Sequence, residues 1–206
     1  IRYDRWLWIH RLIGVAATAA LVVHVLFVSE TFTSSGSPRT AVFILAGVWT
    51  LLWSFVRWQS YAARRRPYTV SRVVPAGKNA YAIDLTPSGA KVFPYAPGQF
   101  AFVSFDSRGI SKEVHPFTLS SAPTRSDSLQ ITVRRSGDWT DRIGVLRQGD
   151  TAYVQGPFGH FTHLLEAPGR EIVMIAGGIG ITPMLSMLRY MSDTKDPRSV
   201  TLIWSN

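Results

Sequence analysis

The chain begins with two long apolar runs, continues with short alternating segments, and ends in a third kind of pattern. The first run extends roughly from Trp6 to Val28 and the second from Thr40 to Trp58. As helices, both are long enough to cross about 30 Å of hydrocarbon. The connecting segment SETFTSSGSPRT is polar and rich in turn-forming residues, so we expect it to lie in water. We therefore expect a membrane-spanning hairpin. A soluble helical hairpin is the alternative, but its helices rarely run this long without charges.

From Tyr68 onward the chain changes to β-prone segments in which apolar and polar positions alternate. Turns that contain Gly or Pro separate these segments. Six of them predict a small antiparallel barrel. In chain order they are YTVSRVV, AYAIDLT, QFAFVSF, HPFTLSS, LQITVRR and TAYVQG.

A third pattern follows Ala167-Pro168-Gly169, which we interpret as a linker. EIVMIA is typical of a buried strand, GGIGITP of a glycine-rich turn, MLSMLRYM of a helix and VTLIW of the next strand. This order predicts a βαβ unit and a parallel sheet. The fold expected is thus multi-domain: two transmembrane α-helices at 1–60, an antiparallel six-stranded β-barrel at 61–167, and the start of an α/β domain at 168–206.

Charge is unevenly distributed in this basic chain, which has 22 Lys and Arg against 13 Asp and Glu, a net +9. Arginines precede or open the first apolar run and cluster after the second, whereas only Arg39 lies in the connecting loop. The positive-inside rule explains this pattern better than nucleic-acid binding does. Both ends of the hairpin are then cytoplasmic and the loop is external. The arginines outside the loop are Arg2, Arg5, Arg11, Arg57, Arg64, Arg65, Arg66 and Arg72.

The chain contains no cysteine, which excludes disulfides and thiolate metal or iron–sulfur sites within these residues. No cleavable signal peptide is evident. The chain starts at Ile1 without a methionine and stops at Asn206 inside the βαβ pattern, so we interpret it as a fragment.

Two histidines, His10 and His24, lie fourteen residues apart in the first apolar run. In a helix this spacing advances about 21 Å and returns to within about 40° of the same face. Imidazole is a common axial ligand of haem iron, and an ionisable group in a membrane span is usually functional. The pair therefore suits two haems stacked across a bilayer. Either histidine alone would more often be a hydrogen-bonded packing residue than a ligand.

The turn GGIGITP joins a strand to a helix, where glycines let backbone N–H groups approach a phosphate. It lacks the spacing of the Rossmann fingerprint, and tight packing of strand on helix explains it equally well. HPFTLSS places an aromatic ring beside hydroxyls, as a flavin requires. VRRSGDWT adds cations and a glycine turn that could clamp a pyrophosphate. Taken singly, either string could be an ordinary strand end.

The order of five strings resembles the ferredoxin-reductase-type flavin domain, and more closely the ferric reductase and NADPH oxidase family. The matching strings are APGQF (96–100), HPFTLSSAP (115–123), RRSGDWT (134–140), GPFG (156–159) and GGIGITPML (177–185). The opening WLWIHRLIG and His24 look like the haem-ligating helix of that family. The second run looks like its last helix before the flavin domain.

The resemblance implies a role for each matching residue. In that family the phenylalanine of HPFT packs on the flavin, the threonine approaches the flavin N5, and the arginine binds pyrophosphate. Here these are Phe117, Thr118 and Arg134, and the first two are the expected catalytic positions. Other expected FAD contacts are His115, Pro116, Leu119, Ser120, Ser121, Gly137 and Thr140. Gly177, Gly178, Gly180, Thr182 and Pro183 would receive NADPH or NADH, and His10 and His24 would each ligate one b-type haem.

The implied function is electron transfer from NAD(P)H through FAD and two haems to an external acceptor such as ferric iron or dioxygen. The expected location is the cell membrane, multi-pass, with the nucleotide-binding domains cytoplasmic. The expected partners are the lipid bilayer, further helices of the same protein that supply the opposing haem ligands, and the external acceptor, with no nucleic acid. Two alternatives stay open: a membrane-anchored flavin reductase without haem, and a non-catalytic nucleotide-binding subunit. The family's remaining helices and carboxy-terminal cysteine motif are absent from this chain, so this segment alone should not complete either haem.

Overall fold

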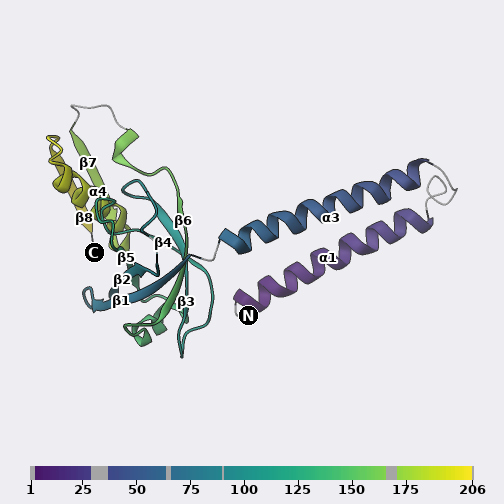
Figure 1. Ribbon diagram of the computed structural model, residues 1–206, viewed down its shortest axis with the longest axis horizontal. Helices are drawn as coiled ribbons and strands as arrows, with labels where there is room; N and C mark the ends of the chain where they lie inside the picture. The colour runs from purple at the N-terminus through teal and green to yellow at the C-terminus, as the bar shows by residue number, and fades with distance from the viewer. Residues whose placement is uncertain (1–2, 29–36, 64–65, 90, 166–170, 206) are drawn as a thin grey trace. The chain divides into compact units, whose positions relative to one another are not determined.

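The computed structural model describes residues 3–28, 37–63, 66–89, 91–165 and 171–205 of the chain (Figure 1). It divides into two compact units, Ile1–Ser60 and Tyr61–Asn206. The first unit is helical. Of the elements that the structure describes, the second unit contains the strands and one further α-helix.

The first unit contains α1 (Tyr3–Val28) and all but the last turn of α3 (Ser37–Ala63). The prediction that residues 37–40 belong to a polar loop is wrong, because α3 already begins at Ser37. Pro38 is compatible with this start, since a helix leaves its first N–H groups unpaired in any case. The remainder of the predicted loop, residues 29–36, lies outside the described residues.

Apolar side chains are exposed all around the described parts of both helices, as in Leu21 (62% exposed) and Leu51 (73% exposed). Within the described residues, one helical segment is long and apolar enough to cross a membrane, Thr40–Gln59. In α1 the described apolar stretch is Leu12–His24, with side chains outside the description on either side of it. Length and composition therefore support the second predicted span, and the first stays a prediction.

The barrel consists of six antiparallel strands in the order β4-β3-β6-β1-β2-β5. An isolated antiparallel bridge between Leu119 and Ile131 joins the two ends of this order and closes the sheet. The prediction of a six-stranded antiparallel barrel is confirmed. The strands are β1 (Pro67–Pro75), β2 (Ala80–Pro87), β3 (Phe100–Asp106), β4 (His115–Thr118), β5 (Leu129–Arg134) and β6 (Thr151–Phe158).

Alternation along each strand explains the core of the barrel. In β3, for example, Ala101, Val103 and Phe105 are fully buried, whereas the residues between them are partly exposed. Because side chains point to opposite faces in turn, every second residue enters the interior. Burying one such large apolar side chain contributes roughly 1.5–3 kcal/mol, so the interior residues specify the register of every pair of strands.

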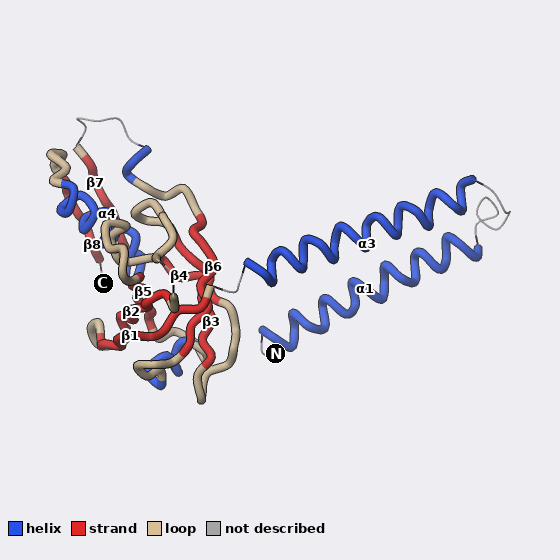
Figure 2. The backbone as a smooth tube through the Cα atoms, in the orientation of Figure 1, coloured by secondary structure: helices blue, strands red, loops and turns tan. Residues whose placement is uncertain are grey.

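The rest of the second unit is a βαβ unit, as predicted. Strands β7 (Ile172–Gly177) and β8 (Val200–Ser205) are parallel, and α4 (Ile181–Thr194) connects them. Figure 2 shows α4 beside the β7–β8 pair. The helix buries a methionine-rich face against β7 that includes Met184, Met187 and Met191. The predicted linker at 167–169 lies outside the described residues.

Candidate functional site

Strand β4 carries the aromatic part of the predicted flavin site. Phe117 is half-buried and packs on the barrel core, and its ring stacks on Trp139 with centroids 6.0 Å apart. Pro116 is exposed between His115 and Phe117. The Thr118 side chain is half-buried, and its hydroxyl has no hydrogen-bond partner among the described residues. An aromatic surface thus lies beside an available hydroxyl, the combination expected for a flavin ring.

A short network of side chains holds His115 against Trp139. The two ring centroids are 4.1 Å apart. His115 Nε2 lies 3.3 Å from Glu113 Oε2, and the Ser111 hydroxyl donates to the other oxygen of Glu113. The Trp139 indole N–H donates to the Ser111 carbonyl at 2.9 Å, so the contacts form a closed ring that returns to Trp139. The network ties the segment before β4 to the turn that contains Trp139.

The turn after β5 carries the predicted pyrophosphate clamp. Arg134 ends β5 and is exposed, and its guanidinium has no carboxylate partner in the described part of the chain. Gly137 has φ +152°, and a Cβ there would meet nothing within 4 Å. The Thr140 hydroxyl accepts from the Ser136 N–H at 2.9 Å and so stabilises the turn at the start of the 3₁₀ helix η1 (Thr140–Val145). The Arg134 guanidinium is thus available to a ligand, whereas the Thr140 hydroxyl is hydrogen-bonded within the turn.

The glycine-rich turn lies directly beside this arginine. Gly177 ends β7, the short 3₁₀ helix η3 (Gly178–Gly180) follows, and α4 begins at Ile181. Gly178 has φ +49°, and a Cβ built there would lie 3.0 Å from Arg134 Nη1. The spaces at Gly177 and Gly180 are open. Two elements that are far apart in the chain therefore place the Arg134 cation next to a helix N-terminus.

Two residues of this turn have structural roles. Thr182 is buried, and its hydroxyl donates to the Ile179 carbonyl at 3.0 Å. Pro183 stands in the first turn of α4, where its missing N–H leaves no helical bond unmade. Both residues stabilise the start of the helix and thereby hold the shape of the turn.

Ser120 and Ser121 are fully buried, as is Leu119, which belongs to the barrel core. The Ser120 hydroxyl lies 3.1 Å from the Thr132 hydroxyl. The Ser121 hydroxyl lies 2.8 Å from the Tyr95 hydroxyl and accepts from the Gln130 N–H at 2.9 Å. Burial raises the pKa of Tyr95 to about 12. Both serine hydroxyls are thus engaged inside the protein.

Comparison with known families identifies both nucleotide-binding parts. Residues 68–159 match the family of FAD-binding domains, and residues 174–206 match the oxidoreductase NAD-binding domain. The chain carries a ferredoxin-reductase-type module. It therefore contains the FAD- and NAD(P)-binding parts of an NAD(P)H-dependent oxidoreductase.

Individual relatives of the module agree with this assignment. A flavohemoprotein of Deinococcus radiodurans is 32% identical over 143 residues, which are 67% of this chain and 35% of that protein. Dual oxidase 2 of Rattus norvegicus is 35% identical over 124 residues, 52% of this chain and 8% of that protein. The chain spans about a third of the length of the first curated relatives it matches. The match to a dual oxidase confirms the resemblance to the NADPH oxidase family in the module.

The fold of the module is also found in solved structures. The flavohem-like FAD/NAD-binding domain of nitric oxide dioxygenase from Vibrio cholerae O1 biovar El Tor superposes with a TM-score of 0.61. The two chains are 23% identical, and the alignment covers 68% of this chain and 61% of that one. At this low sequence identity, the likeness shows that the two chains share a fold and nothing more.

The module's own residues fit a dinucleotide. A pyrophosphate needs cationic and N–H donors with room for its oxygens, and Arg134 beside the open turn at Gly177 and Gly180 supplies both. The flavin ring needs an apolar face, which Phe117 supports through its stack on Trp139. Sequence reasoning did not select Trp139 or Glu113, although both lie within or next to strings it used. Two features of the sequence could have pointed to them: Trp139 follows the glycine turn at Gly137, and Glu113 stands two positions before His115.

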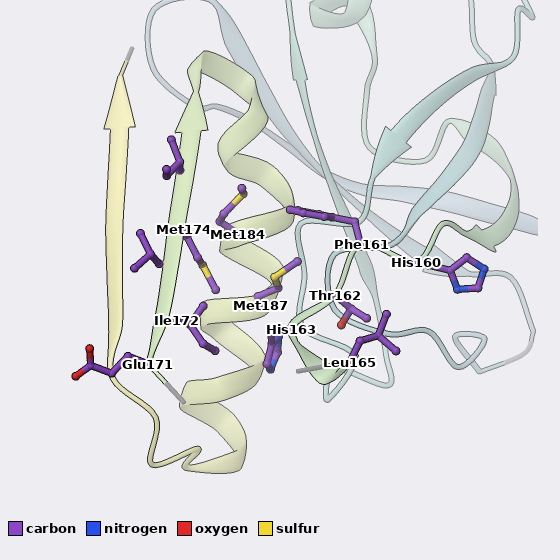
Figure 3. Close-up of a pocket in the computed structure, with 12 residues that line it drawn as sticks. His160, Phe161, Thr162, His163, Leu165, Glu171, Ile172, Met174, Met184 and Met187 are labelled. Carbon is purple, nitrogen blue, oxygen red and sulfur yellow. The ribbon is translucent and has the colours of Figure 1, made fainter. Parts of the chain in front are cut away.

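A cavity away from these residues lies alongside β7 and α4 and has a volume of about 670 Å³ (Figure 3). His163 in its wall is 4% exposed, and neither ring nitrogen has a hydrogen-bond partner among the described residues. Burial lowers the pKa of His163. None of the predicted site residues is among the described residues that line this cavity. The lining is interrupted at residues 166–170, outside the described part of the chain.

The two predicted haem ligands, His10 and His24, are both exposed on α1. The His10 ring stacks on Trp6 with centroids 5.2 Å apart. Helix α3 contains no histidine. The helical unit therefore presents one imidazole at the height of His10 along α1 and one at the height of His24. Within the described residues no three or more His, Cys, Asp or Glu side chains gather as a metal cluster. Each of the two histidines would thus supply one of the two axial ligands of a b-type haem.

Proposed function

We propose that the chain is part of a membrane oxidoreductase that passes electrons from NAD(P)H through FAD and two b-type haems to an external acceptor. The observation that carries the proposal is the Arg134 guanidinium next to Gly178. This contact brings the pyrophosphate clamp of the barrel to the nucleotide-binding turn of the α/β part. The two cofactors would therefore bind side by side, as hydride transfer requires.

Each site residue has a task that follows from its position. Phe117 and Trp139 support the flavin ring, and the available Thr118 hydroxyl can donate a hydrogen bond to the flavin N5. The glycine turn and the N-terminus of α4 stabilise the phosphates of the nicotinamide nucleotide. When bound, FAD would supply the conversion of one hydride from NAD(P)H into two singly released electrons and one proton, which goes to solvent.

The membrane part of the proposal rests on the helices. Helix α3 contains a segment of spanning length, Thr40–Gln59, and the described apolar side chains of both helices are exposed. A helix that is apolar all round needs lipid or protein around it. The positive-inside rule then places the nucleotide-binding module in the cytoplasm of a multi-pass protein. We infer that the lipid bilayer and further helices of the same protein are its partners.

The haem part of the proposal rests on His10 and His24. The opposing axial ligands would come from helices outside this chain. The similarity of the chain to a dual oxidase and to flavohemoproteins supports this proposal. Ferric iron and dioxygen are both compatible external acceptors.

A haem-free, membrane-anchored flavin reductase is the second candidate. The observation in its favour is that the His10 ring already stacks on Trp6, a packing contact that needs no metal. In that case both histidines pack in the protein, and the acceptor is cytoplasmic.

Spectra of the full-length protein separate the two candidates. We expect reduced-minus-oxidised spectra with b-type haem bands, and we expect His24→Ala to remove one haem signal while NAD(P)H still reduces the flavin. Ile9→Ala is the matched control on the same helix, since Ile9 is also exposed and has no ligating atom. Absence of a haem spectrum, or an unchanged spectrum in both histidine variants, would overturn the haem assignment.

A further inference from the structure

Three polar side chains on one face of α4 face the barrel. Ser186, Arg189 and Asp193 follow the spacing i, i+3 and i+7, which places them in one row along the helix. All three bond to the segment that follows β4. We call these three residues the α4 latch.

The partners of the latch are consecutive or nearly so. Ser186 Oγ donates to the Ser121 carbonyl at 2.7 Å, a fully buried bond between residues 65 apart in the chain. Arg189 Nη1 donates to the Ser120 carbonyl at 2.6 Å. The Thr124 hydroxyl donates to the Asp193 carboxylate. The helix is thus fixed along more than one turn and cannot rotate about a single contact.

Arg189 also reaches into the sheet. Its Nη1 donates to Gln130 Oε1 at 2.8 Å, and Gln130 Nε2 in turn donates to Asp84 Oδ1 at 2.8 Å. The guanidinium is therefore connected to β5 and, through Gln130, to β2. A hydrogen bond that involves a charged group contributes roughly twice as much as a neutral one. Arg189 makes two bonds of this kind and Asp193 makes one, so Arg189 is the strongest of the three attachments.

The latch connects the two nucleotide sites at defined points. Ser120 lies two residues after Thr118, the expected neighbour of the flavin N5. On the other side, the glycine turn directly precedes the first residue of α4, and Gly178 lies against Arg134. Any sliding of α4 along the barrel would change the separation of these two points.

We propose that Arg189, together with Ser186, is a positioning residue that sets the approach of the nicotinamide to the flavin. This inference rests on the proposed transfer from NAD(P)H to FAD. Arg189 touches neither cofactor; it acts through the position of α4. A misplacement of about 1 Å in reacting groups can cost about a hundredfold in rate.

The test compares Arg189→Ala, Arg189→Lys and Ser186→Ala in the full-length protein. The matched control is Lys78→Ala, which removes an exposed cation from the turn between β1 and β2. The first measurement is hydrogen exchange of the amides of residues 181–194. We expect about tenfold faster exchange in Arg189→Ala, because local opening becomes easier when charged hydrogen bonds are lost. Lysine has a single ammonium donor in place of the two-pronged guanidinium. The exchange rate of Arg189→Lys should therefore fall between those of the wild type and Arg189→Ala.

The second and third measurements are the affinity for FAD and the rate of flavin reduction at saturating NAD(P)H. We expect the FAD dissociation constant to stay within about twofold and the reduction rate to fall about tenfold in Arg189→Ala. Ser186→Ala is nearly isosteric in its buried site, so it should fold and show the same direction of change. Unchanged exchange or an unchanged reduction rate in the Arg189 variants would overturn the inference. Failure of the wild-type flavin to be reduced by NAD(P)H would instead refute the proposed function, and the exchange data would still decide whether the latch exists.

Discussion

Replacing Gly98 by alanine should destabilise the module far more than an ordinary glycine substitution. Gly98 is the third residue of a turn closed by the Gln99 N–H, which donates to the Ala96 carbonyl at 3.2 Å. Its φ is +94°, a left-handed backbone conformation that costs a non-glycine residue about 1–2 kcal/mol. A Cβ there would also lie 2.2 Å from the Phe161 carbonyl oxygen and 2.5 Å from Met187 Cε.

These two contacts differ in how they can be relieved. The methionine end can move at little cost, but the Phe161 carbonyl belongs to the backbone, so the chain itself must shift. Overpacking of this kind typically costs about 1–3 kcal/mol. Together with the backbone term, the expected loss is roughly 2–5 kcal/mol of the free energy of unfolding.

Gly77→Ala is the matched control. Gly77 has φ +88°, and a Cβ added there would meet nothing within 4 Å, so its substitution should cost the backbone term alone. Urea unfolding of both variants, followed by tryptophan fluorescence, measures the difference. We expect Gly98→Ala to be less stable than Gly77→Ala by about 1–3 kcal/mol. Equal losses would refute the argument from close approach.

Three further predictions follow from the side chains of the module. Arg134→Ala should raise the dissociation constant for FAD or for NAD(P)H about 10–100-fold in equilibrium titrations, because charge-assisted bonds to phosphate are lost. If both dissociation constants are unchanged, Arg134 is not part of the pyrophosphate clamp. The pKa of Tyr95 is raised from 10.0 to about 12, so its contribution to stability is complete below pH 10 and is lost as the pH rises toward 12; Tyr95→Phe should flatten the unfolding free energy over that range, and an unaltered slope would count against it. The Arg198 side chain lowers the pKa of Asp196 from 3.8 to about 2, so its stabilising effect is present above pH 3.8 and is lost as the pH falls toward 2; acid unfolding of Asp196→Asn should lack this component, and identical acid profiles would contradict it.

The barrel and the βαβ unit were predictable because their patterns are local. Each strand alternates strictly enough that burial of every second residue defines both the strand and its register, as Val103 and Phe105 illustrate. The boundary of α3 was not predictable from the same kind of reasoning. Ser37 and Pro38 are typical of turns, but they are equally typical of the first turn of a helix, and polarity does not separate the two.

The first apolar run shows a second limit. Trp6 to Val28 lies within α1 (Tyr3–Val28), so its helical state is as predicted, but it also contains His10 and His24. These two ionisable residues suggested the haem site, and they also raise the cost of placing the segment in a membrane, so the two arguments are not independent. A membrane span with two ionisable groups needs the function to justify its cost.

The site residues show the deepest limit, because a motif states which side chains are present and not what they face. Ser120 and Ser121 stand in a string typical of flavin sites, and their hydroxyls are compatible with binding phosphate. In the fold they are fully buried, their hydroxyls bond within the barrel, and their carbonyls accept from α4. The partners, Ser186 and Arg189, lie 65 and 69 residues away in the chain. Direct phosphate contact by these hydroxyls would need the Tyr95–Ser121 and Ser120–Thr132 pairs to open, so their part in cofactor binding is more economically explained through the position of α4.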